Sequence, residues 1–280
     1  MKFKLLSLLF IVTTLSIQAQ IKTPQPSPSS KVEQTIGLTD VTLEYSRPSM
    51  RGRIIYGDLV PFGQKWRTGA NANTKITFST DVEIGGNSLK KGTYAIYTIP
   101  NKDSWDIMFY NDATNWGLPK KWDESKVALK VNTKTVPLGF KMETFTMAFG
   151  DLADLKSGML YIMWESTEVG IKINVPTEKI ALASIEKVMA GPSANDYFGA
   201  ATYYQTSGKD NKQALEWINE AVKMNPEAFW MYRRKSLIQA DLGDKKGAIA
   251  TAKKSLELAQ KADNMDYVKM NKESIAKWSK

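Results

Sequence analysis

The spacing of apolar residues changes near Glu178, and this change restricts the chain to a β part followed by an α part. From residue 31 to 175 apolar side chains recur close to every second position, as in Phe145, Met147 and Phe149. That spacing is typical of half-buried strands, and no helical spacing interrupts it. The sequence predicts about ten short strands in an antiparallel β-sandwich or barrel, followed by a short array of helices.

Two segments of the β part are apolar on both faces of the expected strand. They are residues 93–99 and 105–110, and turn residues flank them at Gly85-Gly86 and Pro100-Asn101. A strand with two apolar faces needs cover on both sides. We therefore expect these two strands near the middle of the sheet.

The helical part contains an internal repeat. Ala214 and Ala248 are 34 positions apart, and glycines end the first helix of each expected unit at Gly208 and Gly243. A period of 34 is that of tetratricopeptide repeats, which this part resembles. Because two units cannot cover their own apolar faces, we expect flanking helices at about residues 178–189 and 265–279.

The first thirty residues have the features of an export signal followed by a tether. A basic start precedes an apolar run from Leu5 to Ile17, and Ala19 is a small residue at the expected cleavage point. The run is shorter than the ~20 residues of a spanning helix, so no stable membrane span is expected after cleavage. A membrane-anchored N-terminus is the alternative. The predicted divisions are a signal peptide at 1–19, an extended Pro/Ser-rich tether at 20–30, a β domain at 31–176 and a helical domain at 177–280.

The chain contains no Cys and no His. This excludes disulfides, thiolate and imidazole zinc sites, and every Ser–His or Cys–His catalytic pair. The sequence also lacks phosphate-binding and calcium-binding loop motifs, so we expect no metal and no cofactor. The formal net charge is +9, but Lys and Arg are interspersed with acids, so we expect no nucleic-acid partner.

The segment from residue 45 to 74 breaks the strand pattern and mixes arginines with glycines, prolines and aromatic residues. A guanidinium binds carboxylate or phosphate oxygens in pairs and stacks on aromatic rings, so the segment could line a pocket for an anion or a sugar. In the alternative interpretation these arginines pair with acids such as Asp40, Glu44 and Asp58 and tie the loop to the sheet. The candidate ligand-binding residues, which include one exposed Trp from a later loop, are Arg47, Arg51, Arg53, Tyr56, Trp66, Arg67, Asn71, Asn73 and Trp116.

Paired carboxylates are a catalytic arrangement that the composition still permits. A glycosidase needs two of them about 5–10 Å apart across a cleft. The available acids of the β part are Asp112, Asp123, Glu124, Glu143, Glu165 and Glu168. Nothing in the sequence brings two of these together, so we assign no catalytic residue.

Four motifs of the β part carry a family resemblance. They are Ser46-Arg-Pro-Ser-Met-Arg-Gly-Arg53, Trp66-Arg-Thr-Gly-Ala-Asn71, Gly92-Thr-Tyr94 and Ile99-Pro100. From Ser29 through Trp164-Glu165 the chain resembles a family of exported bacterial proteins that is abundant in Bacteroidota, the domain of unknown function numbered twenty-nine eleven. The resemblance implies no activity, substrate or cofactor.

Together these features predict an exported, non-enzymatic binding or assembly protein of the periplasm or cell envelope, or a secreted one. A protein or peptide partner is expected at the helical repeat, which could instead pack on the β domain as a stabilising appendage. An anionic or sugar ligand is expected at the Arg-rich loop. The alternative functions are a hydrolase or lyase that acts on an envelope glycan with paired carboxylates, and a binding protein for a small anion or sugar.

Export can be checked directly on the protein. We expect the exported chain to begin at Gln20, because the small Ala19 meets the requirement of signal cleavage. N-terminal sequencing of the protein recovered from its producing cells measures this, and a chain that still begins at Met1 would contradict the prediction.

Overall fold

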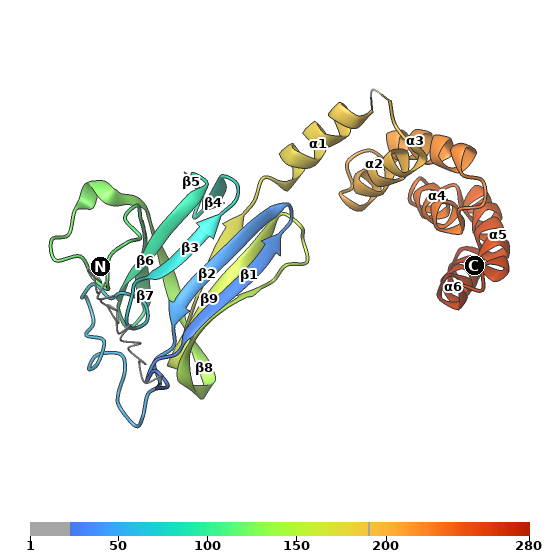
Figure 1. The fold of residues 1–280 in the computed structure, drawn as a ribbon. Coiled ribbons are helices and arrows are strands. Elements are labelled where there is room, and N and C mark those ends of the chain that lie inside the picture. Colours follow the sequence, from blue (N-terminus) through green and yellow to red (C-terminus); the bar gives the residue numbers. More distant parts are fainter. Residues whose placement is uncertain (1–22, 190) are drawn as a thin grey trace, which may run out of the picture. The chain divides into compact units, whose positions relative to one another are not determined.

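The computed structural model describes residues 23–189 and 191–280, and the predicted signal peptide and the first residues of the predicted tether lie outside this range. The chain divides into two compact units between Val175 and Pro176. The first unit consists of strands and one short 3-10 helix, Glu124–Lys126, and the second consists of helices (Figure 1). The predicted fold class, a β domain followed by a helical array, is therefore confirmed.

The described β unit is a nine-stranded antiparallel sheet with the order β1-β2-β3-β6-β7-β8-β9-β4-β5. About ten strands were expected, but residues 127–131 and 144–149, which have the pattern of two strands, belong to one long β8. The strands are β1 (Ser29–Ile36), β2 (Thr39–Ser46), β3 (Thr74–Phe78), β4 (Val82–Ile84), β5 (Asn87–Leu89), β6 (Gly92–Pro100), β7 (Ser104–Tyr110), β8 (Val127–Gly150) and β9 (Ser157–Asn174).

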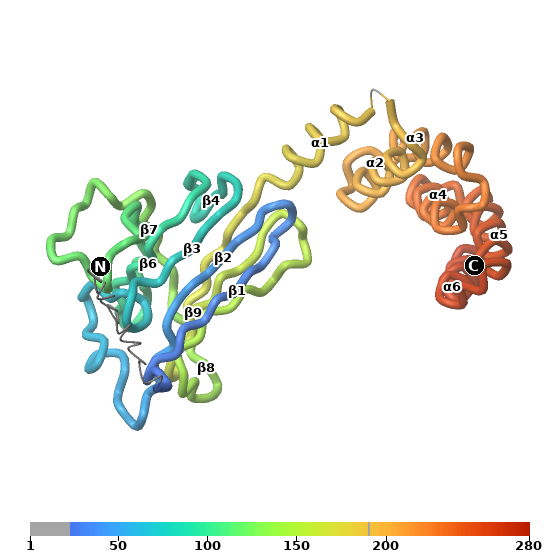
Figure 2. Tube along the Cα trace, viewed as in Figure 1, coloured from blue at the N-terminus to red at the C-terminus, as the bar shows by residue number. Residues whose placement is uncertain are grey.

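The long β8 turns the sheet back on itself. Its first part pairs with β7 from Val127 to Lys134, and its second part pairs with β9 from Thr135 to Gly150. The path of β8 from one layer to the other can be followed in Figure 2. Inward side chains from both layers share one apolar core, so the sheet forms a sandwich.

The strands β6 and β7 lie in the middle of the order, as their two apolar faces predicted. One face, with Ile96 and Phe109, belongs to the main core. The other face, with Tyr97 and Tyr110, packs against Trp122 from the segment 111–126. That segment therefore serves as a cover for the outer face of the sheet.

The helical unit consists of six described helices that follow one another along the chain. They are α1 (Thr177–Val188), α2 (Ala194–Thr206), α3 (Asn211–Met224), α4 (Phe229–Asp241), α5 (Lys245–Lys261) and α6 (Met265–Trp278). Gly208 and Gly243 follow α2 and α4 with φ of 65° and 83°, values that glycine adopts without strain. Among the described helices, none has the length and apolar character needed to cross a membrane.

Small residues allow close packing inside the helical unit. Ala214 and Ala248, one repeat apart, are both fully buried. At the position equivalent to Ala221, Ser255 donates a hydrogen bond from Oγ to the carbonyl of Phe229 (2.7 Å). Helix pairs thus recur with the expected period, while their assignment as tetratricopeptide repeats stays a prediction.

The core of the sandwich can be tested with two tryptophans of opposite burial. Trp105 is 1% exposed, and we expect Trp105→Ala to lower the free energy of unfolding of the β unit by about 3–5 kcal/mol, because it leaves a large cavity. Trp116 is 75% exposed, so Trp116→Ala should change stability by less than about 0.5 kcal/mol. Denaturant unfolding followed by circular dichroism compares the two variants, and equal losses would contradict the assignment of the core.

Candidate ligand-binding site

The irregular segment 47–73 connects β2 to β3 and crosses one end of the sandwich (Figure 1). Main-chain hydrogen bonds fix it there. Trp66 N donates to Thr98 O (2.7 Å), and Thr98 N donates to Trp66 O (3.0 Å). Phe145 N donates to Pro48 O (2.8 Å). The segment is thereby held between β6 and β8.

Residues 68–71 have an unusual backbone. Thr68 and Asn71 have φ of 57° and 58°, and Gly69 has φ of 139°. A Cβ on Gly69 would lie 3.0 Å from the carbonyl oxygen of Ser46, so both the conformation and the close approach require glycine. Thr68 is strained because β-branched residues rarely adopt positive φ, and strained residues are concentrated at functional sites.

The four arginines of the segment donate to carbonyl oxygens. The alternative interpretation is therefore right that they tie down the loop and wrong that their partners are acids such as Asp40, Glu44 and Asp58. Within the described residues none of these arginines forms an ion pair with a carboxylate. The bonds to carbonyls run from Arg47 Nε to Phe145 O (3.1 Å), Arg51 Nη2 to Pro26 O (3.0 Å), Arg53 Nη2 to Ser49 O (2.7 Å), Arg53 Nε to Met50 O (2.9 Å) and Arg67 Nη1 to Asn71 O (3.0 Å). Arg47 Nη2 also donates to the hydroxyl of Thr146 (2.6 Å). Each guanidinium has five N–H donors, so donors are left over at every one.

A pocket of about 350 Å³ opens where the segment meets the end of the sandwich. We call it the Arg–Trp pocket. Four of the nine predicted binding residues line it, namely Arg53, Trp66, Arg67 and Asn71. The remaining lining residues, which include neither Asp nor Glu, are Ser27, Pro48, Leu59, Val60, Gly69, Ala70 and Trp164.

Two stacked indole rings form the apolar wall of the Arg–Trp pocket. The rings of Trp66 and Trp164 lie 6.0 Å apart at an interplanar angle of 15°. Trp164 donates from Nε1 to the carbonyl of Glu143 (3.2 Å), and the rings of Phe145 and Trp105 pack edge-on against Trp66. Because its neighbours restrain each ring, the wall is preformed.

The guanidinium of Arg67 lies against Gly117 of the segment 111–126. A Cβ on Gly117 would be 2.9 Å from Arg67 Nη1, and φ of Gly117 is 74°. Glycine at this position therefore allows the guanidinium of Arg67 to approach the segment closely. The preceding Trp116 is exposed and does not line the Arg–Trp pocket.

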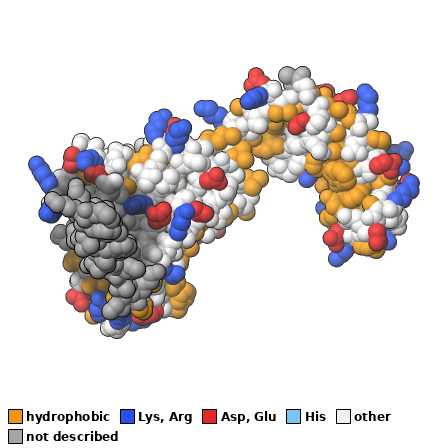
Figure 3. Space-filling view, viewed as in Figure 1, with side chains coloured by type: hydrophobic (Ala, Val, Ile, Leu, Met, Phe, Trp, Pro, Cys, Tyr) orange, Lys and Arg blue, Asp and Glu red, His pale blue; other side chains and the backbone are white. Residues whose placement is uncertain are grey.

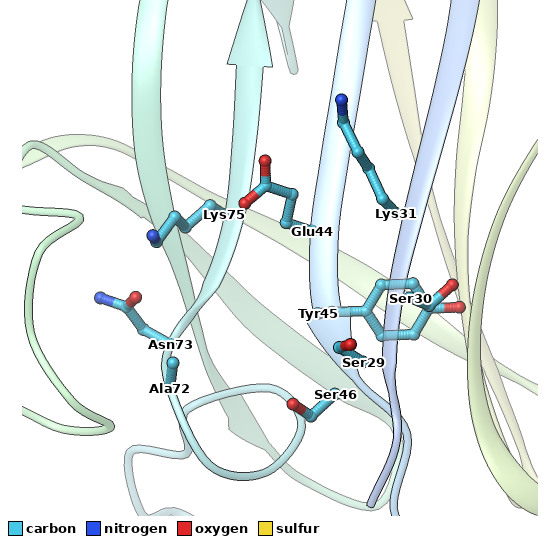
Figure 4. Close-up of a pocket in the computed structure, with 9 residues that line it drawn as sticks. All are labelled: Ser29, Ser30, Lys31, Glu44, Tyr45, Ser46, Ala72, Asn73 and Lys75. Atoms are coloured by element: carbon cyan, nitrogen blue, oxygen red, sulfur yellow. The ribbon is translucent and has the colours of Figure 1, made fainter. Parts of the chain in front are cut away.

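Asn73 belongs to a neighbouring hollow of about 360 Å³ on the outer face of β1, β2 and β3. Figure 4 shows Lys31, Glu44 and Lys75 side by side on these strands, as their register requires. The Asn73 side chain is directed away from them, and its Nδ2 donates to Tyr97 Oη (3.4 Å). Because Glu44 lies between Lys31 and Lys75, this hollow, unlike the Arg–Trp pocket, already contains a carboxylate beside its cations.

Tyr56 lies behind the wall of the pocket. Its ring packs edge-on against Trp66, Trp105 and Trp164. Its hydroxyl is buried and has no hydrogen-bond partner in the described residues. Burial, and then the nearby carboxylate of Glu165, raise the pKa of Tyr56 well above 10, so the phenol is neutral at physiological pH.

Three of the six acids considered for catalysis have hydrogen-bond partners outside the lining of the pocket. Glu143 Oε1 accepts from Arg51 N (2.9 Å), and Glu165 Oε2 accepts from Tyr56 N at 3.5 Å. Hydrogen bonds from Lys126 and Thr114 lower the pKa of Asp112 to about 2. An acid with so low a pKa is a poor proton donor at neutral pH.

Two lining residues of the pocket could not be selected from the sequence pattern. Trp164 alternates with Leu160 and Ile162 on the inner face of β9, so its pattern indicated a core residue. Ser27 lies in the predicted tether. In the folded chain β9 and the tether reach the same end of the sandwich, and only this arrangement shows that Trp164 and Ser27 both line the pocket.

A model of a protein family of unknown function, DUF2911, matches residues 27–173, which is more than half of the chain. The chain belongs to this family. The match covers most of the β unit and the whole of the Arg–Trp pocket, and it ends before α1. No curated protein matches the chain.

The unpartnered hydroxyl of Tyr56 leads to a prediction about pH. Burial favours the protonated phenol in the folded state and raises its pKa. The stability that this pKa difference contributes is present below pH 10 and is lost as the pH rises through the folded-state pKa. Tyr56→Phe should therefore be neutral or stabilising by up to about 1 kcal/mol at pH 7. Above pH 10 the difference in free energy of unfolding between Tyr56→Phe and the unmodified chain should grow in favour of the variant. Denaturant unfolding at several pH values measures this difference.

Tyr45 is the matched control, because its hydroxyl donates to Met147 O and accepts from Met147 N, both at 3.0 Å. Tyr45→Phe should destabilise the β unit by about 1 kcal/mol. Equal losses in both variants at pH 7 would show that Tyr56 has a partner after all.

Proposed function

We propose that this protein binds a small anionic ligand of sugar size in the Arg–Trp pocket and does not convert it. One observation carries the proposal: Arg53 and Arg67 border a pocket whose described lining contains no carboxylate. A cation beside a cavity without an acidic partner favours a ligand that brings the negative charge. The guanidinium donors that the carbonyls leave unused are available for it.

The residues of the pocket indicate the chemistry of the ligand. Guanidinium forks suit carboxylate or phosphate oxygens, and the amide of Asn71 adds a donor for a hydroxyl or carbonyl. An indole face such as that of Trp66 packs on an apolar ring or a sugar face. The volume of about 350 Å³ suits a ligand of one or two rings, such as a sugar acid or a sugar phosphate.

Binding without turnover agrees with the composition of the site. Acid–base chemistry on a sugar needs two carboxyl groups at the scissile bond, and the described lining offers none. The N-terminal sequence pattern supports export, so we place this binding activity in the periplasm, in the cell envelope or outside the cell.

The proposal predicts selective binding of sugar acids. Glucuronate, galacturonate and glucose 6-phosphate should raise the melting temperature of the full chain, whereas galactose should not. A ligand at 100 times its dissociation constant adds about 2.7 kcal/mol of stability, which a thermal-shift assay detects. Arg67→Ala should weaken binding by about tenfold or more, because it removes charge-assisted hydrogen bonds.

Lys134→Ala provides the control for a general loss of positive charge. Lys134 is exposed on β8 and does not line the pocket. This variant should bind the acids as the unmodified chain does. Binding that is equal for galactose and galacturonate, or unaffected by Arg67→Ala, would contradict the proposal.

A second binding surface on the helical unit is supported by a separate observation. Arg233, Arg234 and Lys235 are consecutive, half-buried cations of α4, and burial lowers the pKa of each. Within the described residues none of them pairs with a carboxylate, and Arg233 Nη1 has no hydrogen-bond partner. Figure 3 shows apolar side chains gathered over α4 beside charged residues. We propose that an acidic segment of a protein partner binds there, which the resemblance to tetratricopeptide repeats also favours.

A fluorescent peptide of alternating Glu and Leu tests the helical surface. Its anisotropy should rise with the full chain, and Arg234→Ala should weaken binding by about tenfold, since a half-buried cation makes charge-assisted bonds. Lys272→Ala, at an exposed position of α6, is the control. Equal affinity for a Lys/Leu peptide of the same length would contradict the proposal.

A further inference from the structure

The chain that precedes β1 is bound to the arginine-rich segment by its own carbonyl oxygens. Arg51 Nη2 donates to Pro26 O (3.0 Å), Asn71 Nδ2 donates to Ser27 O (3.1 Å), and Arg47 N donates to Pro28 O (2.9 Å). Three consecutive carbonyls are thus held by three residues that the sequence pattern assigned to ligand binding. We call residues 23–28 the strap.

The sequence of the strap explains why its carbonyl oxygens are available to other groups. It reads Thr-Pro-Gln-Pro-Ser-Pro, with proline at every second position. Proline has no N–H, and a residue before proline is restricted to extended conformations. Such a chain makes no internal hydrogen bonds, so all of its carbonyl oxygens are free to accept from other groups.

The strap lies at the same place as the proposed ligand. Ser27 lines the Arg–Trp pocket, and it contacts the amide of Asn71, which is also a lining residue. Asn71 Nδ2 also donates to Ser46 Oγ at 3.4 Å, so its bond to the Ser27 carbonyl is the shorter of the two. A ligand oxygen that binds Asn71 must therefore compete with the carbonyl of Ser27.

Polar bonds hold the strap more than apolar burial does. Residues 23–26 are exposed and Ser27 is only half-buried. A segment with few buried apolar contacts opens locally at a small free-energy difference. The strap can thus leave its site without unfolding of the sandwich.

We propose that the strap is an autoinhibitory contact, which occupies the Asn71 amide of the Arg–Trp pocket until an anionic ligand displaces it. This proposal rests on the function proposed above and adds its regulation. A carboxylate or phosphate replaces the neutral carbonyl oxygen of Ser27 with a charged oxygen and makes a stronger bond to the same Asn71 donor. Binding of the ligand and release of the N-terminal segment are therefore coupled.

Arg51 separates this proposal from a simple anion site, because it holds the strap but does not line the pocket. Arg51→Ala in the full chain removes a donor from Pro26 and should tighten galacturonate binding by about threefold to tenfold, the effect of one hydrogen bond. If Arg51 instead attracted or contacted the ligand, the same substitution would weaken binding. Lys134→Ala, which removes a charge elsewhere, should leave the affinity within about twofold.

A single introduced thiol can report on the strap, because the chain has no cysteine. In Ser27→Cys the rate of alkylation by iodoacetamide should rise about threefold or more when galacturonate saturates the protein. It should also rise without ligand when Arg51→Ala is added. Ser88→Cys, at an exposed position of β5, is the control and should react at one rate under all conditions.

The outcomes distinguish the two proposals. If galacturonate binds to the unmodified chain but Arg51→Ala does not bind it more tightly, the strap inference is wrong and the binding function stands. An alkylation rate of Ser27→Cys that bound galacturonate leaves unchanged would likewise overturn the strap inference alone. If neither the sugar acids nor glucose 6-phosphate bind to the unmodified chain or to Arg51→Ala, both proposals are wrong.

Discussion

The packing of Trp66 against the core is the interaction on which the site depends. Trp66 belongs to a segment without regular structure, yet its ring contacts Trp105, Phe145 and Trp164 and its main chain pairs with Thr98. An aromatic ring of this size contributes a large share of the apolar burial at the end of the sandwich. Once Trp66 is in place, the next residue, Arg67, is directed to the rim, where it meets Gly117.

The second constraint is the way in which the arginines are satisfied. All four bind backbone carbonyls, which are neutral, so the loop is tied down while its positive charge stays uncompensated within the described residues. Ion pairs with acids would have fixed the loop equally well but would have cancelled the field of the site. With carbonyl partners the same guanidiniums can tie the loop to the sheet and still attract an anion. The anion-pocket and loop-tying interpretations of the arginine-rich segment are therefore compatible.

The strap extends this principle to the N-terminal segment. Prolines at alternate positions give it an extended shape and free carbonyls, which Arg51 and Asn71 bind. In the proposed function the β unit therefore contains both a site and an internal competitor for it. The helical unit carries half-buried cations on α4 that form no ion pair with a carboxylate within the described residues.

The sequence by itself determined the classes of structure and the residues from which a site could be made. Period-two spacing of apolar residues specified the strands, a 34-residue period specified the helix pairs, and the absence of His and Cys removed most catalytic chemistry, since these are local or compositional properties. Only the tertiary structure decided which candidates meet. Arg53, Trp66, Arg67 and Asn71 come together with Trp164, whereas Asn73 and Trp116 face elsewhere, because the return of β9 and the left-handed turns at residues 68–71 set the direction of each side chain. Local spacing carries no information about such long-range contacts, nor about the choice of carbonyl over carboxylate partners by the arginines.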